Sequence, residues 1–138
     1  MLKIVQVDSA RPYPPRITAF TRTFWDALRE GRLLTTECEA CHAYTFPPKA
    51  FCPHCWGRDM RWSALSGRGR LYSSTSVHAA PAAFRQQAPY RVGIVDLVEG
   101  PRIAVGLWGE PPPALDAPVQ IIVLDYTDGP LFVAESAE

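Results

Sequence analysis

The sequence of 138 residues has little lysine, no excess of charge of either sign and no long hydrophobic run. Only two of its 14 basic residues are lysine, and 14 acidic residues balance them to a formal net charge of zero. This balance gives no general attraction to nucleic acid or to an anionic membrane. The apolar runs are too short for a membrane span, and the first eight residues lack the apolar stretch of a signal peptide. We therefore expect a soluble, cytoplasmic protein.

Proline, in contrast, is frequent, and its clusters predict extended connections between short elements. We interpret residues 1–17 as an extended arm. Residues 18–31 are predicted to form an amphipathic helix, because Phe20, Phe24 and Leu28 fall at helical spacing and Gly31 stands where a left-handed cap belongs. Residues 32–64 hold all the cysteines and are interpreted as a ribbon.

The last segment, residues 65–138, contains five short β-like runs divided by glycine and proline. They lie near 68–78, 90–98, 102–108, 118–125 and 130–134. Glu99–Pro101 is typical of a tight turn, so the second and third runs should pair as an antiparallel hairpin. Alternation along the first run predicts one polar face, carried by Arg70, Tyr72, Ser74, Ser76 and His78. Five strands of this length favour a Greek-key OB-fold barrel, and a mainly β fold for the chain.

All four cysteines lie in one window of 18 residues, as Cys38-Glu-Ala-Cys41 and, ten residues later, Cys52-Pro-His-Cys55. Two such pairs place four thiolates around one tetrahedral zinc ion. Four thiolates leave no open coordination position, so this zinc should hold the fold and catalyse nothing. The ribbon, residues 32–64, needs a bound metal for its stability because it has too little hydrophobic core of its own.

Other chemistry has to be weighed for the same cysteines. Cys38–His42 matches the haem-attachment pattern C-x-x-C-H, and Cys52–Cys55 has the spacing of a thioredoxin-like redox site. Haem attachment needs export, and the redox motif needs a βαβ unit; neither fits the rest of the chain. Iron in place of zinc stays an open alternative. Ligation by His42 or His54 is a further alternative, but with four thiolates present these side chains are expected to lie beside the metal ligands without binding the metal.

Several blocks together resemble a known family. They are Phe24–Leu33, the cysteine pairs with Phe46-Pro-Pro48 between them, Ser66–His78, Ala88-Pro-Tyr90 and Val95–Pro101. In this order they are similar to the rubredoxin-like zinc-ribbon plus OB-fold family associated with acyl-CoA metabolism, formerly a domain of unknown function. The resemblance implies an N-terminal helix, a rubredoxin-like zinc ribbon and an OB-fold. His42 departs from it, since the first knuckle of the family usually carries glycine there.

The resemblance also implies a function: a non-catalytic subunit beside a thiolase-superfamily enzyme, acyltransferase, aldolase or hydratase in lipid or polyketide metabolism. The candidate contact residues follow from side-chain chemistry. Arginine grips phosphates and aromatic rings stack on adenine, so we predict coenzyme A (CoA) contacts at these positions: Arg68, Arg70, Tyr72, His78, Phe84 and Tyr90. Aromatic residues of the helix and ribbon are predicted to contact the enzyme partner: Phe20, Phe24, Trp25 and Phe46.

Two other classes of function compete with this one. A zinc ribbon beside an OB-fold is also the arrangement of single-strand nucleic-acid binders, although the balanced charge argues against it. A free-standing enzyme is disfavoured because no activated nucleophile is evident outside the cysteine cluster. Only the accessory-subunit hypothesis requires a stoichiometric complex with a CoA enzyme.

Overall fold

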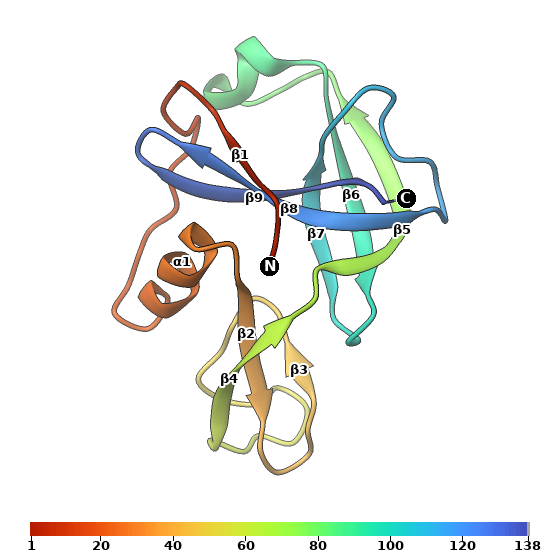
Figure 1. Ribbon diagram of the computed structural model, residues 1–138. Helices are drawn as coiled ribbons and strands as arrows, with labels where there is room; N and C mark the ends of the chain where they lie inside the picture. Colours follow the sequence, from red (N-terminus) through yellow and green to blue (C-terminus); the bar gives the residue numbers. More distant parts are fainter. Residues whose placement is uncertain (138) are drawn as a thin grey trace.

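The cysteine region and the C-terminal half form two separate sheets in the computed structural model, which describes residues 1–137 (Figure 1). The elements in chain order are β1 (Ile4–Gln6), α1 (Arg22–Arg29), β2 (Leu33–Cys38), β3 (Tyr44–Thr45), β4 (Met60–Leu65), β5 (Arg68–Val77), the 3-10 helix η1 (Ala82–Gln87), β6 (Tyr90–Leu97), β7 (Arg102–Leu107), β8 (Pro118–Tyr126) and β9 (Gly129–Ser136). The fold is mainly β, as predicted.

The larger sheet closes into a barrel in the strand order β5-β6-β7-β9-β8, with β8 returning to β5. Strands β7 and β9 run parallel and the other barrel pairs antiparallel. This is the closed five-stranded barrel expected of an OB-fold. Each of the five predicted runs holds one strand, and the predicted hairpin is confirmed by the pairing of Val95 with Ile103 across β6 and β7.

The predicted polar face of β5 is wrong beyond Tyr72. The register of β5 against β6 shifts between Leu71 and Ser73, so Tyr72 is an extra residue that has no partner. One extra residue reverses the side of the sheet to which the following residues point. Ser74 therefore pairs with the buried Gly93, on the same side as Leu71, while Arg70 pairs with Asp96 on the opposite side.

Helix α1 is shorter than the predicted 18–31. Residues 18–21 form a turn instead, because Thr18 and Thr21 exchange hydrogen bonds between each backbone N–H and the other residue's Oγ1, at 2.8 and 3.1 Å. Gly31 does take the predicted left-handed conformation, with φ of +83°. A Cβ atom there would lie 3.1 Å from the carbonyl oxygen of Leu2, so glycine also allows the N-terminus to pass closely.

The first 17 residues include a strand that the sequence did not indicate. Strand β1 pairs in parallel with β8, from Ile4 opposite Val123 to Gln6 opposite Asp125. Further along, the Arg11 guanidinium lies against Gly129 and donates from Nη2 to the carbonyl oxygen of Asp128 at 2.8 Å. The N-terminal segment is thus fastened to the β8–β9 hairpin.

The division of the rest of the chain into a ribbon over residues 32–64 and a barrel over residues 65–138 stays a prediction.

The apolar core is continuous from the helix, through the base of the ribbon, into the barrel. Leu28 of α1 and Leu33 of β2 share one buried cluster with Leu71, Val95 and Ile121 of the barrel. Each fully buried aliphatic side chain contributes about 1.5–3 kcal/mol, so this shared core places the ribbon firmly on the barrel. Within residues 1–137, no helix combines the length and the apolar character that crossing a membrane would require.

Candidate metal centre and surface grooves

The four cysteines converge at the end of the ribbon that lies away from the barrel. Their Sγ atoms all lie within 4.8 Å of one another; Cys38 and Cys55 are 3.5 Å apart, and Cys41 and Cys52 are 3.6 Å apart. These distances are too long for disulfide bonds of about 2.05 Å. They are close to the sulfur–sulfur edge of about 3.8 Å that a tetrahedron with metal–sulfur bonds of about 2.3 Å requires. The chemistry and geometry of the donors therefore fit one four-coordinate metal ion.

Two tight turns of the same design hold the thiols. In each, the residue after the second cysteine donates its N–H to the carbonyl oxygen of the first: His42 to Cys38 at 2.9 Å and Trp56 to Cys52 at 2.8 Å. Both residues take positive φ angles, 62° and 64°, a conformation that normally favours glycine. Neither His42 nor His54 belongs to the donor cluster among the described residues, so the four thiols form the complete set.

Backbone N–H groups favour the thiolate form of the two buried cysteines. The N–H of Cys41 approaches Cys38 Sγ at 3.5 Å, and this contact lowers the pKa of Cys38. The N–H groups of Cys55 and His54 approach Cys52 Sγ, each at 3.4 Å, and lower the pKa of Cys52 to about 6. Because a thiolate, not a thiol, ligates metal, these contacts favour ligation by Cys38 and Cys52. The pKa values of Cys41 and Cys55 are raised instead, Cys41 to about 12.

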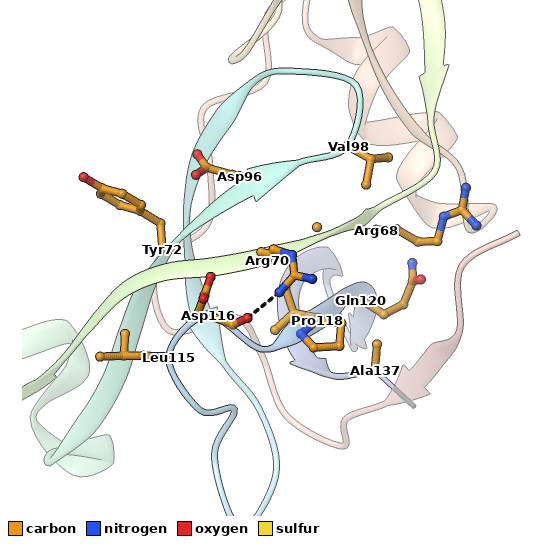
Figure 2. Close-up of a pocket in the computed structure, with 12 residues that line it drawn as sticks. Arg68, Arg70, Tyr72, Asp96, Val98, Leu115, Asp116, Pro118, Gln120 and Ala137 are labelled. Atoms are coloured by element: carbon orange, nitrogen blue, oxygen red, sulfur yellow. Dashed lines mark hydrogen bonds between the residues drawn. The ribbon is translucent and has the colours of Figure 1, made fainter.

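A groove of about 860 Å³, here called the β5 groove, crosses the barrel beside the first half of β5. Figure 2 shows Arg68 and Gln120 at one end and Tyr72 at the other. Arg70 turns toward the β7–β8 connection, where its Nη1 donates to the carbonyl oxygen of Asp116 at 2.6 Å. Three of the six residues predicted to contact CoA thus share one concave surface.

The negative charge of Asp96 in the β5 groove is paired with an arginine of the same chain. Arg102 donates to both carboxylate oxygens of Asp96, at 2.6 and 3.2 Å, and its guanidinium carbon lies 3.8 Å from the centre of the Tyr72 ring. These hydrogen bonds lower the pKa of Asp96. Arg102 therefore covers one face of Tyr72 and neutralises Asp96. Arg68 and Arg70 make no ion pair with a carboxylate in the described part of the chain.

The other predicted CoA residues lie elsewhere. Phe84 and Tyr90 contact each other, with ring centres 5.7 Å apart, and line a different cavity near η1. His78 is exposed at the end of β5 and lines neither of these two hollows. The six residues therefore do not form one site. Their roles stay predictions, with Arg68, Arg70 and Tyr72 as the coherent subset.

The predicted partner-binding aromatics form a junction between helix, ribbon and barrel. Phe24 is only 4% exposed and packs edge-on against Trp25, Phe46 and Phe132, with ring centres 4.9–6.0 Å apart. Phe20 is 37% exposed and lies on Trp62. Phe24 thus contributes to the core of the single chain, while Trp25 and Phe46 are half-buried and reach the surface.

Three contributors to these sites were missed by the sequence reasoning: Phe132, Asp96 and Arg102. Phe132 was hidden because a phenylalanine in a strand is expected to pack within the barrel. The alternation of β6 and the short turn after it could have placed Asp96 opposite Arg102, since the predicted hairpin register makes them cross-strand partners.

Fold and thiol geometry together define a protein with a zinc-ribbon type of metal centre attached to an OB-fold barrel. Two family models match: the ChsH2 rubredoxin-like zinc ribbon domain over residues 25–61, and the ChsH2 C-terminal OB-fold domain over residues 62–125. A solved chain of the Ltp2-ChsH2(DUF35) aldolase is 31% identical, with a TM-score of 0.77, and the match covers 91% of this chain and all of that one. The chain belongs to this ChsH2-type family of zinc ribbon plus OB-fold proteins.

Curated relatives carry several names. The benzoylsuccinyl-CoA thiolase subunit BbsA of Thauera aromatica is 36% identical over 70% of this chain and 68% of its own length. A DUF35 domain-containing scaffold protein of Methanocaldococcus jannaschii is 39% identical over 57% of each. A probable enoyl-CoA hydratase alpha subunit of Thermomonospora curvata is 35% identical over 76% of this chain. The chain spans 33% of the Thermomonospora relative and 57% of the Methanocaldococcus one.

Proposed function

We propose that this protein is an accessory subunit of a heteromeric enzyme that acts on CoA thioesters, and that it holds one structural zinc ion. The full-length likeness to the chain from the Ltp2-ChsH2(DUF35) aldolase carries this proposal, because that match covers ribbon and barrel together. The thiolase-subunit and scaffold names of two relatives support it. The partner is a thiolase, aldolase, acyltransferase or hydratase subunit.

The zinc would be held by Cys38, Cys41, Cys52 and Cys55. Four thiolates supply zinc with a closed tetrahedral shell, so the ion would tie the two turns of the ribbon together without presenting an open position to a substrate. Metal analysis of the purified protein should give about one zinc per chain. Haem absorbance, or a reversible disulfide in place of metal, would contradict this assignment.

Partner binding is tested by size-exclusion chromatography with light scattering. The protein is mixed with candidate thiolase, aldolase, acyltransferase and hydratase subunits in turn, and with one of them a stoichiometric complex with higher turnover than either component is expected. Trp25→Ala and Phe46→Ala, at the half-buried edge of the junction, should weaken the complex. Tyr13→Ala, an exposed aromatic of the N-terminal segment, serves as the control. Two separate peaks, with turnover unchanged on mixing, would reject the proposal.

The β5 groove would receive the phosphates of the CoA moiety. Within residues 1–137 Arg68 and Arg70 have no carboxylate partner, and arginine binds phosphate through two parallel hydrogen bonds. Calorimetric titration of the complex with CoA should show weaker binding for Arg68→Gln and Arg70→Gln. Arg85→Gln, an exposed arginine on η1, is the matched control. A single-stranded oligonucleotide that binds better than CoA would favour the nucleic-acid alternative.

A further inference from the structure

A second cavity, here called the ring pocket, lies at the end of the barrel near η1. Its volume is about 500 Å³, within the range of small-molecule sites, and its lining comes from η1, β6, β7, β8 and β9. Most of the lining is aromatic or aliphatic: Phe84, Tyr90, Leu107, Trp108, Tyr126 and Phe132. The lining of the β5 groove, in contrast, includes two arginines and two aspartates beside its apolar residues.

The ring pocket stands where OB-fold barrels usually bind ligands. That position is the face of the second and third barrel strands, bordered by the loops after the first and fourth. In this chain those strands are β6 and β7, and the bordering loops carry η1 and the β8–β9 turn. Tyr90 pairs with Val77, seven residues along β5 from Arg70, so Arg70 and the strand position opposite Tyr90 lie about 23 Å apart along the strand.

One charged side chain belongs to the lining. Arg91 donates from Nη1 to Ser76 Oγ at 3.4 Å, and it makes no ion pair with a carboxylate within residues 1–137. A guanidinium beside aromatic walls is suited to a carboxylate, which it can bind through two hydrogen bonds. Tyr126 is a second polar group of the lining, and burial raises its pKa, so its hydroxyl stays protonated and able to donate.

The N-terminal segment completes the wall of the ring pocket. Arg11 holds the β8–β9 turn through the carbonyl oxygen of Asp128, and its backbone N–H donates to Asp128 Oδ1 at 2.9 Å. The next residue, Pro12, lines the pocket, and the ring centre of Tyr13 lies 6.4 Å from that of Phe84. Arg11 therefore holds a segment distant in sequence against the cavity.

We propose that the ring pocket binds a small molecule made of one or two apolar rings that bear a carboxylate. The rings lie against Trp108 and Tyr90, and the carboxylate pairs with Arg91. This site shares no lining residue with the β5 groove, and it shares Phe132 with the aromatic junction. The proposal uses neither the CoA assignment nor the partner assignment.

The test uses the full-length, zinc-loaded protein and two probes of the same shape, 2-naphthoate and its neutral analogue 2-naphthylmethanol. The indole N–H resonance of Trp108, assigned with Trp108→Phe, reports binding. Naphthoate should shift it saturably and bind at least fivefold more tightly than the alcohol. Arg91→Gln should weaken naphthoate binding about tenfold while leaving the alcohol unchanged. Gln87→Trp, at the lining and exposed, should fill the opening and weaken both probes.

Arg85→Gln is the control, because Arg85 is an exposed arginine of η1 outside the lining. The proposal is overturned if naphthoate leaves the Trp108 resonance unchanged, if the alcohol binds as tightly as the carboxylate, or if Arg91→Gln behaves like Arg85→Gln. Melting temperatures of all variants show that each is folded. Association with the enzyme subunit is measured separately, so failure of the pocket and failure of the accessory role are distinguishable.

Discussion

The barrel and the ribbon bury different kinds of side chain. Barrel positions with almost no exposure are aliphatic and include Leu71, Val95, Val119 and Ile121. Between residues 35 and 64 the buried side chains are instead Thr35, Thr36, Glu37, Cys38, Thr45 and Cys52. Hydrophobic burial accordingly stabilises the barrel, but it cannot stabilise the outer part of the ribbon.

Hydrogen bonds satisfy the buried polar groups of the ribbon. The Thr35 hydroxyl donates to the carbonyl oxygen of Thr45, and Thr36 Oγ1 accepts from the N–H of Lys49 at 2.9 Å. Arg61 donates to Glu37 from the neighbouring strand at 2.9 Å. Such bonds each add about 1 kcal/mol net, which is little for so many ordered residues. We therefore expect metal binding to supply in the ribbon the stability that burial supplies in the barrel.

The largest expected effect comes from breaking the metal site. Cys52→Ser removes a ligand that is 1% exposed and should release the metal, because the three remaining thiolates no longer close the shell. We expect the amide resonances of residues 34–64 to collapse while those of the barrel stay dispersed. Zinc content and two-dimensional NMR measure both. His54→Ser, beside the ligand, should change neither. A metal-free ribbon with native resonances would show that the ribbon folds without the metal.

Phe24→Ala should produce the next largest effect, because it affects both regions at once. Phe24 is buried against Phe46 of the ribbon segment and Phe132 of the barrel, and truncating such a ring costs about 3–5 kcal/mol. Denaturant unfolding followed by NMR should show ribbon and barrel both less stable. Phe20→Ala, at a more exposed ring, should cost clearly less. A loss confined to one region would show that Phe24 does not join them.

His42→Gly should stabilise the ribbon by up to about 1 kcal/mol, because glycine adopts a positive φ without the steric penalty of a Cβ atom. The gain is smaller than the penalty since glycine also makes the unfolded chain more flexible. Competition with a chelator should show slower zinc release, with unchanged unfolding of the barrel. Faster release would mean that the His42 side chain itself supports the turn.

The smallest expected effect concerns pH and the barrel. Arg102 holds the pKa of Asp96 below its ordinary value of 3.8, so the carboxylate stabilises the folded chain above that pH. The contribution is lost as pH falls through the lowered pKa. Asp96→Asn should therefore lower the melting temperature slightly at pH 7 and by less at pH 2. An equal difference at both values would assign the effect to packing.

Much of the architecture was predictable because it depends on local patterns. The spacing of Cys38, Cys41, Cys52 and Cys55 predicts one four-thiol cluster, since each pair closes its own tight turn. Alternating apolar residues and turn signals located all five barrel strands. The β5 bulge at Tyr72 escaped this reasoning, because a single unpaired residue leaves no mark on composition or spacing.

The sequence by itself determined the thiol cluster, the positions of the barrel strands and the left-handed cap at Gly31, because each depends on residues close together in the chain. Tertiary structure alone decided which aromatic rings are buried and how β1 pairs with β8. It also decided that Arg70 lines the β5 groove while Tyr90 lines the ring pocket. These features arise from contacts between residues far apart in sequence. Closure of the barrel and the fastening of Arg11 to the β8–β9 turn set those contacts, and neither is encoded in a local pattern.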